Sequence, residues 1–130
     1  MILSIVIPVY NSEEILDELI NQITSAIDKK INLFKEFEII LVNDSSEDSS
    51  WQKIKDISNN QKNIIGINLS KNFGQHNALM AGIKISRGDF LITMDDDLQH
   101  PPSYIEEIIN KLNEGLDVCY TKYQNNKYSF

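Results

Sequence analysis

The 130-residue sequence has few cysteines, few basic residues and no long apolar segment, and each shortage excludes a class of protein. The single cysteine, Cys119, excludes an internal disulfide, and its apolar neighbours predict a core position in a protein of a reducing, cytoplasmic compartment. With 12 Lys and Arg against 19 Asp and Glu, the net charge of −7 argues against a nucleic-acid-binding surface. No segment is long enough to span a bilayer.

The apolar start of the chain, residues 1–8, lacks a basic region and contains a proline, so it is interpreted as a first strand and not as a signal peptide. The length and the 42% hydrophobic content fit one globular domain with a real core. We expect that domain to cover residues 1–121. A polar, asparagine-rich tail follows over residues 122–130.

Short apolar runs alternate with helical patterns along the whole chain. The predicted strands are residues 3–7, 37–42, 64–69, 90–94 and 117–121. Apolar residues with the three-and-four spacing of a core-facing helix occur within residues 15–27, 51–57, 79–83 and 105–112. This alternation predicts an α/β domain with a mainly parallel sheet sandwiched by helices. Its most continuous apolar strand, residues 37–42, suits the centre of the sheet.

Three carboxylates, Asp95, Asp96 and Asp97, directly follow the predicted strand at residues 90–94. An Asp-x-Asp pattern alone is expected about once by chance in a chain this rich in aspartate. Its position carries more weight, because the carboxyl ends of parallel strands meet at one sheet edge, where open α/β folds bind ligands. Oxygen ligands at that edge suit a divalent cation that holds a diphosphate.

The other predicted strands also end in polar or aromatic residues, so a shared pocket is expected at this edge. Asp44 offers an acceptor for a base N–H or a ribose hydroxyl, Tyr10 offers a ring for base stacking, and Pro8 would fix the turn beside them. A structural role is an equal alternative for each of these three. Lys71 either contacts donor phosphates or is simply solvated.

Ordinary structural explanations are favoured for several other polar residues. Ser12 and Asp48 are typical helix-start residues. His76 and His100 have no partner histidine at metal-ligand spacing, so they are interpreted as a helix-start and a turn residue. Small residues near Gly82 are expected to let a helix approach the sheet closely.

Four segments in order resemble family 2 glycosyltransferases. They are residues 4–11 (SIVIPVYN), 42–46 (VNDSS), 72–82 (NFGQHNALMAG) and 94–102 (MDDDLQHPP). The last two are similar in particular to the branch that moves a sugar onto a polyprenyl phosphate, including dolichyl-phosphate mannose synthases and undecaprenyl-phosphate aminoarabinose transferases. The resemblance implies a Rossmann-like GT-A fold, a UDP- or GDP-linked sugar donor, Mg²⁺ or Mn²⁺, and inversion at the anomeric carbon.

The resemblance also assigns roles to individual residues. It puts Pro8, Tyr10 and Glu13 in the base-binding segment and makes Asp44 the acid that recognises the nucleoside. For the acidic loop, the implied metal and catalytic residues are Asp95 and Asp97, with Gln99 assisting the metal and Asp96 reaching the ribose. Lys71 falls near the donor phosphates.

The implied acceptor is a lipid phosphate of the cell envelope. The expected location is the cytoplasm, or the inner face of the cytoplasmic membrane for a full-length protein. Relatives continue through an acceptor-binding half, which leaves one alternative open, and the size of this α/β chain and its aspartates leave a second. One is a non-catalytic nucleotide-sugar or metal-binding module. The other is a phosphoacceptor receiver-like domain, which would want an acidic pair after the first strand, where residues 8–11 are Pro-Val-Tyr-Asn.

Overall fold

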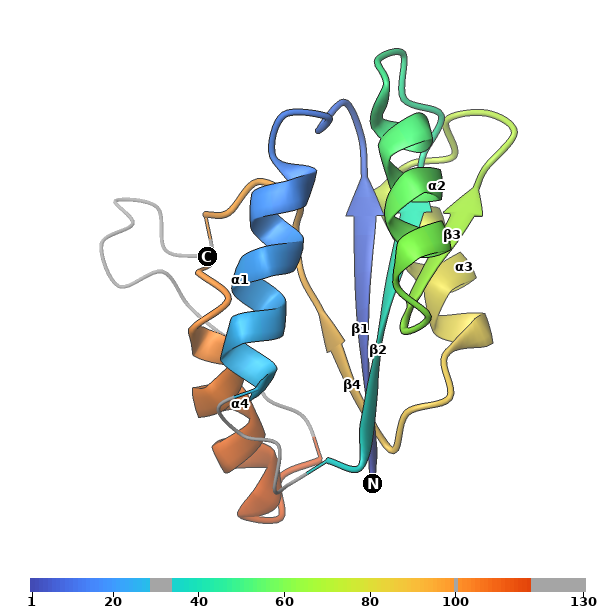
Figure 1. Cartoon of the computed structure of the whole chain (residues 1–130). Coiled ribbons are helices and arrows are strands. Elements are labelled where there is room, and N and C mark those ends of the chain that lie inside the picture. The colour runs from blue at the N-terminus through green and yellow to red at the C-terminus, as the bar shows by residue number, and fades with distance from the viewer. Residues whose placement is uncertain (29–33, 100, 118–130) are drawn as a thin grey trace, which may run out of the picture.

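A computed structural model describes residues 1–28, 34–99 and 101–117, in which strands and helices alternate (Figure 1). The strands are β1 (Ile2–Val9), β2 (Glu36–Asn43), β3 (Ile64–Asn68) and β4 (Phe90–Thr93). The helices are α1 (Leu16–Asp28), α2 (Ser50–Asn60), α3 (Gln75–Ile85) and α4 (Tyr104–Asn113). These four strands confirm the predictions to within two residues at each end. None of these helices has the length and apolar character needed to cross a membrane.

Several sequence predictions concern positions that lie outside the described residues. These are the fifth strand beyond Asp117, the core position of Cys119, the turn role of His100 and the tail at residues 122–130.

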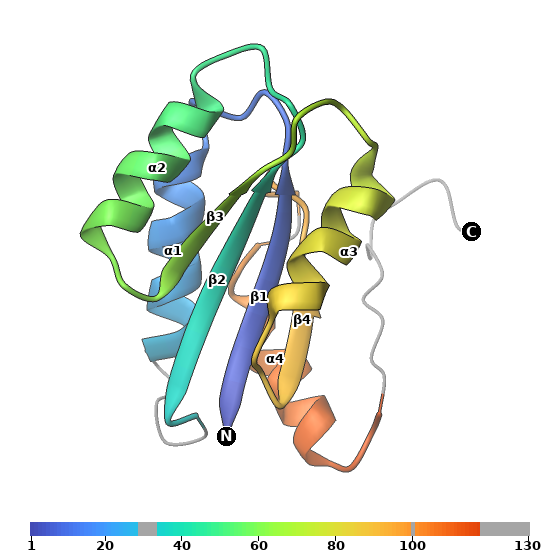
Figure 2. The same ribbon diagram turned by 90° about the vertical axis from the view of Figure 1, so that its right-hand side faces the viewer.

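The four strands form one parallel sheet in the order β3-β2-β1-β4. In the register, Ile5 is opposite Ile39, and Leu3 is opposite Phe90 on the other side of β1. Helices α1 and α2 cover one face of the sheet, and α3 covers the opposite face (Figure 2). Helix α4 packs in the same core cluster as α1 and α2 and lies beside α1 (Figure 1). The predicted α/β sandwich with a parallel sheet is therefore confirmed.

The central strand β2 contributes to both sides of the core because successive side chains of a strand point to opposite faces. Ile39 and Leu41 pack in the cluster beneath α1, α2 and α4, whereas Ile40 and Val42 pack beneath α3. All four side chains are fully buried. This two-sided burial explains why residues 37–42 are almost continuously apolar, as parallel strands usually are.

Helix α3 lies unusually close to the sheet at Gly82. A Cβ atom at this position would be 2.4 Å from Val6 Cγ1 and 3.1 Å from Val42 Cγ2. Only glycine fits this approach without displacement of the strand side chains. The expectation that small residues bring this helix close to the sheet is confirmed.

Pro8 lies inside β1, opposite Val42, and not in the turn that the sequence suggested. The Val6 carbonyl accepts from Met94 N–H on the β4 side, and Pro8, two residues further on, faces the same way. Because β4 ends at Thr93, Pro8 lies beyond the paired part of that edge and no ladder hydrogen bond is lost. The proline is thus accommodated in a central strand because its neighbour is short.

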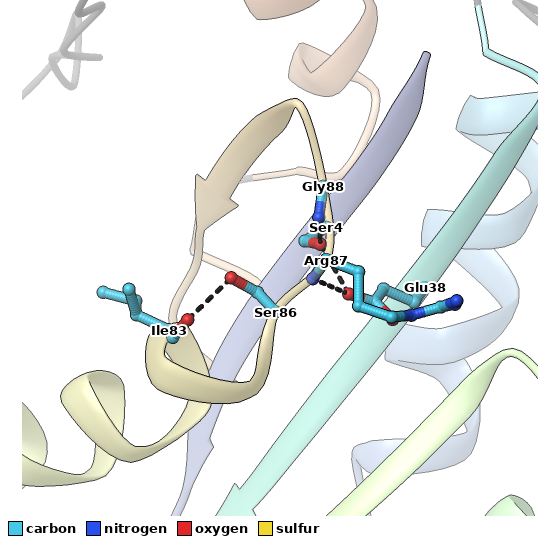
Figure 3. Close-up of polar contacts among 6 residues, drawn as sticks. All are labelled: Ser4, Glu38, Ile83, Ser86, Arg87 and Gly88. Atoms are coloured by element: carbon cyan, nitrogen blue, oxygen red, sulfur yellow. Dashed lines mark hydrogen bonds and ion pairs between the residues drawn. The ribbon is translucent and has the colours of Figure 1, made fainter.

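A buried carboxylate joins three segments at the amino edge of the sheet, opposite the ends discussed below (Figure 3). Glu38 is 1% exposed, and its Oε1 accepts from Ser4 Oγ at 2.6 Å and from Arg87 N–H at 2.7 Å. Arg87 Nε donates to Oε2 at 3.1 Å, and Gly88 N–H donates to Ser4 Oγ at 2.8 Å. Burial opposes ionisation, but the hydrogen bonds from Ser4 and Arg87 outweigh it and hold the pKa of Glu38 below its ordinary value.

Candidate functional site

The carboxyl ends of the parallel strands meet at one edge of the sheet, which we call the rim. Strands β1, β2, β3 and β4 end there at Val9, Asn43, Asn68 and Thr93. The loops after β1, β2 and β3 extend together from the top of the sheet in Figure 1. The predicted gathering of polar loops at one edge is confirmed, and their hydrogen bonds define the site.

The β1–α1 and β2–α2 loops are joined along their length by main-chain donors and side-chain acceptors. Asn11 N–H donates to Ser46 Oγ at 3.0 Å, and Glu47 N–H donates to Asn11 Oδ1 at 2.9 Å. Ser49 N–H donates to Glu13 Oε2 at 3.0 Å, while Glu13 N–H donates to Asp48 Oδ2 at 3.2 Å. Glu13 is therefore engaged at the start of α2. Its predicted role in base binding stays a prediction.

Asp48 also accepts from Ser50 N–H at 2.9 Å, which supplies a partner for a donor at the start of α2. Burial raises the pKa of Asp48, but hydrogen bonds from Ser50 and Glu13 outweigh this effect and lower it overall. The expected helix-start role of Asp48 is confirmed.

Asp44 is buried at the end of β2, with 5% exposure, and its two carboxylate oxygens hold the β3–α3 loop. Oδ1 accepts from Phe73 N–H at 2.8 Å, and Oδ2 accepts from Gly74 N–H at 3.1 Å. Asp44 therefore has a structural role, which was one of its two predicted roles. This role does not exclude contact with a nucleoside, because each carboxylate oxygen can accept a second hydrogen bond.

The three acids after β4 have different partners, although they are adjacent in sequence. Asp95 Oδ1 accepts from Gln75 Nε2 at 2.7 Å, on the first turn of α3. Asp96 Oδ2 accepts from Tyr10 N–H at 3.0 Å and from the Ser12 hydroxyl. Asp97 Oδ1 accepts from the N–H of Gln99 in its own loop at 3.1 Å. Asp95 and Asp96 therefore link loops, whereas Asp97 is tied only locally.

The fit of a divalent cation can be judged from these oxygen atoms. Among the described residues, no group of three His, Cys, Asp or Glu side chains is arranged to hold a metal. Asp95 and Asp97 each use Oδ1 in a hydrogen bond, and Oδ2 of each has no hydrogen-bond partner among the described residues. Mg²⁺ and Mn²⁺ are commonly held by one or two carboxylates together with substrate phosphates. These two carboxylates would fit such a cation only together with a diphosphate that supplied the remaining ligands.

The remaining predicted site residues lie on exposed parts of the rim. The side chain of Tyr10 is 46% exposed, so its ring is available for stacking. The Lys71 ammonium lies 5.1 Å from the ring centroid of Phe73 in the same β3–α3 loop. Gln99 is exposed, and its side chain makes no hydrogen bond to a described residue. His76 lies in the first turn of α3, as expected.

Two linking residues escaped the sequence interpretation. The sequence interpretation assigned no role to Gln75. Its polar side chain is the first of α3, directly after a rim loop, and this position was the signal that could have identified it. The Ser12 hydroxyl was expected to act at a helix start, but it donates to Asp96 Oδ2, and the carbonyl of Tyr10 lies 3.1 Å away as an alternative acceptor for the same proton. Only the Ser12 carbonyl serves the helix, by accepting from Leu16 N–H at 3.2 Å. No local pattern links Ser12 to a residue 84 positions away.

Solved structures share this fold. The 1–349 fragment of S. aureus TarS is 24% identical over 88% of this chain, with a TM-score of 0.67, and this chain covers 33% of it. The same fragment in complex with UDP is 25% identical over 88% of this chain and 32% of its own length, with a TM-score of 0.65. The mannosyltransferase PcManGT from Pyrobaculum calidifontis, in complex with GDP-Man and Mn²⁺, is 16% identical over 85% of this chain and 32% of its own length, with a TM-score of 0.69.

This chain therefore spans about a third of the length of these solved structures. The sequence model of the family described as Glycosyl transferase family 2 matches residues 4–129, which is nearly the whole chain. The parallel sheet and its rim loops are consistent with this match. The chain belongs to glycosyltransferase family 2.

Proposed function

We propose that this chain is the donor-binding part of an inverting, metal-dependent glycosyltransferase. It binds a UDP- or GDP-linked sugar at the rim, and the sugar passes to a polyprenyl phosphate at a membrane surface. One observation carries the proposal: the loops after β1, β2 and β4 bring the exposed ring of Tyr10 and the carboxylates of Asp44, Asp95 and Asp97 to the same edge of the sheet. The UDP complex of TarS and the GDP-Man complex of PcManGT support a nucleotide-sugar ligand.

One set of rim residues binds the nucleoside of the donor, and another binds its diphosphate and the cation. Tyr10 stacks on the base, with Pro8 and Glu13 shaping the same segment, and Asp44 accepts from the nucleoside. Asp95 and Asp97, assisted by Gln99, hold the cation, and Lys71 balances phosphate charge. When bound, Mg²⁺ or Mn²⁺ neutralises the negative charge that develops on the diphosphate as the sugar bond breaks.

Charge is compatible with the proposed acceptor. The oxygen of a lipid phosphate is already anionic, so its attack on the anomeric carbon needs no protein base. A hydroxyl acceptor would normally need such a base. The last two motifs, at residues 72–82 and 94–102, resemble the polyprenyl-phosphate branch and favour the phosphate acceptor.

The proposal is tested by calorimetric titration of UDP and GDP into the chain, with Mn²⁺ and with EDTA. We expect one nucleotide to bind, more tightly with Mn²⁺. Asp97→Asn should remove most of the Mn²⁺-dependent gain, whereas Asp28→Asn, which changes an exposed acid at the end of α1, should keep it. Absence of binding by both nucleotides would overturn the proposed donor site.

A second candidate function is donor binding without transfer, because the rim residues described above are assigned to the donor and the cation and none of them to an acceptor. Donor hydrolysis and transfer to a polyprenyl phosphate in detergent micelles separate the two. UDP-GlcNAc and GDP-Man are the first donors to compare, since each is bound in a solved relative. Metal-dependent binding without turnover would identify this chain as a binding module.

A further inference from the structure

We propose that Asp96 is a positioning residue that clamps the β1–α1 loop, with the Tyr10 ring, onto the acidic loop after β4. Its carboxylate acts through the loop and not by contact with the cation or the sugar. The proposal rests on the proposed function for the identity of the ligand. The clamp itself is a property of the chain alone, and it is tested separately below.

The clamp consists of two hydrogen bonds to one oxygen atom. Asp96 Oδ2 accepts from Tyr10 N–H at 3.0 Å and from the Ser12 hydroxyl, across 86 and 84 positions of sequence. Ser12 is 8% exposed and Asp96 is half-buried. Hydrogen bonds to an ionised acceptor are roughly twice as strong as neutral ones, and partial burial strengthens them further.

Asp96 anchors the β1–α1 loop from the side of the acidic loop. Asn11, between the two donors, has a φ of 50° in the left-handed region. The opposite side of the loop is already tied to the β2–α2 loop, where Ser12 N–H donates to Ser50 Oγ at 2.8 Å. Loss of Asp96 therefore frees one side of the loop and leaves the other attached. The fold should survive while the exposed Tyr10 ring loses its fixed position.

The neighbouring acids show why this role falls to Asp96. Asp95 is held by a side chain of α3, and Asp97 is held only by Gln99 of its own loop. Of the three, only Asp96 accepts hydrogen bonds from the described residues of the loop that carries Tyr10. Its charge is directed toward two donors of that loop, which also eases the repulsion expected among three adjacent carboxylates.

A clamp and a metal ligand have different thermodynamic signatures. A metal ligand changes the ratio of the dissociation constants measured with EDTA and with Mn²⁺. A clamp that positions the nucleoside end changes both constants by the same factor and leaves their ratio at the wild-type value. This ratio is independent of any uniform loss of folded protein.

The binding test compares UDP and GDP, each with Mn²⁺ and with EDTA, on wild-type protein, Asp96→Ala and Ser12→Ala. We expect both variants to weaken binding about two- to tenfold, as for loss of one or two hydrogen bonds, with an unchanged Mn²⁺ ratio. The double variant should bind no more weakly than Asp96→Ala, because both changes break one clamp. Glu47→Ala, which removes an exposed acid of the adjacent loop, is the charge control. Wild-type binding by Ser12→Ala, together with loss of the Mn²⁺ ratio in Asp96→Ala, would overturn the clamp.

Amide hydrogen exchange without nucleotide tests the clamp independently of the proposed function. We expect the Tyr10 amide to exchange at least about tenfold faster in Asp96→Ala and in Ser12→Ala, while amides of β1 keep their protection. Unchanged Tyr10 exchange in both variants would overturn the clamp. If wild-type protein bound neither nucleotide but Tyr10 exchange rose as expected, the donor site would be wrong and the clamp would stand.

Discussion

The side-chain amide of Gln75 donates a hydrogen bond of 2.7 Å to Asp95 Oδ1 and joins the first turn of α3 to the loop after β4. A carboxylate held in this way is oriented before a cation binds. We predict that Gln75→Ala lowers the Mn²⁺-dependent gain in nucleotide affinity about tenfold. Nucleotide affinity in EDTA should stay near the wild-type value. Calorimetric titration with and without Mn²⁺ measures both quantities.

A matched control is available on α2, where Gln52 Nε2 donates to Asp56 Oδ1 at 3.1 Å on an exposed surface. Gln52→Ala removes the same kind of amide–carboxylate bond away from the rim and should leave the Mn²⁺ effect intact. Wild-type metal dependence in Gln75→Ala would contradict the orienting role of Gln75.

Asp44 is predicted to stabilise the protein even without nucleotide, because it holds the N–H groups of Phe73 and Gly74. In Asp44→Asn, an NH2 group replaces one acceptor oxygen, so the hydrogen bond to Phe73 N–H or to Gly74 N–H is lost, although Gly74 N–H keeps Asn72 Oδ1 as an acceptor at 3.1 Å. The free energy of unfolding should fall by about 1–3 kcal/mol, measured by urea denaturation of nucleotide-free protein. Asp28→Asn is the control. Unchanged stability of Asp44→Asn would mean that this carboxylate serves only a ligand.

The sequence was sufficient for the fold because each strand and helix is encoded by its own apolar pattern. Residues 37–42 indicated the central strand directly, since burial on both faces requires an apolar residue at nearly every position. The same pattern concealed Glu38, a charged residue whose partners, Ser4 and Arg87, lie 34 and 49 positions away. Its burial depends on tertiary hydrogen bonds that no local periodicity reports.

The rim follows the same rule. The positions of the strand ends in the sequence were enough to predict where polar side chains gather. They did not predict which of these side chains hydrogen-bond to each other. Asp95, Asp96 and Asp97 are chemically identical, and only the fold separates one held by α3, one held by the β1–α1 loop and one held locally. Pro8 was misplaced for a related reason: a proline usually marks a turn, and its tolerance inside β1 depends on where β4 ends.

The close approach of α3 to the sheet makes Gly82 sensitive to substitution. In Gly82→Ala, the added Cβ would lie 2.4 Å from Val6 Cγ1, so the helix or the strand side chains must shift. Overpacking of this kind is expected to cost about 1–3 kcal/mol of unfolding free energy, despite the higher helix propensity of alanine. Lys84→Ala, at an exposed position of the same helix, controls for propensity. Equal or greater stability of Gly82→Ala by thermal denaturation would contradict the packing.

Glu38 should make the stability of the protein fall in acid. The hydrogen bonds from Ser4 and Arg87 hold its pKa in the folded protein below the ordinary value of 4.5. The ionised carboxylate therefore contributes stability that is fully present above pH 4.5 and is lost as the pH falls through the folded-state pKa. Glu38→Gln removes the charge and makes the side chain a poorer acceptor, so it should lower the unfolding free energy at pH 7 by about 1–3 kcal/mol.

The difference between wild-type protein and Glu38→Gln isolates this carboxylate from the other acids that titrate in the same range. Urea denaturation at a series of pH values from 7 downward should show that difference constant at first and then shrinking below pH 4.5, because Glu38 itself becomes neutral. Glu36→Gln, at an exposed position two residues earlier in β2, should show little difference at any pH. A difference for Glu38→Gln that persists undiminished in acid would mean that packing, and not the charge of Glu38, holds the amino edge of the sheet together.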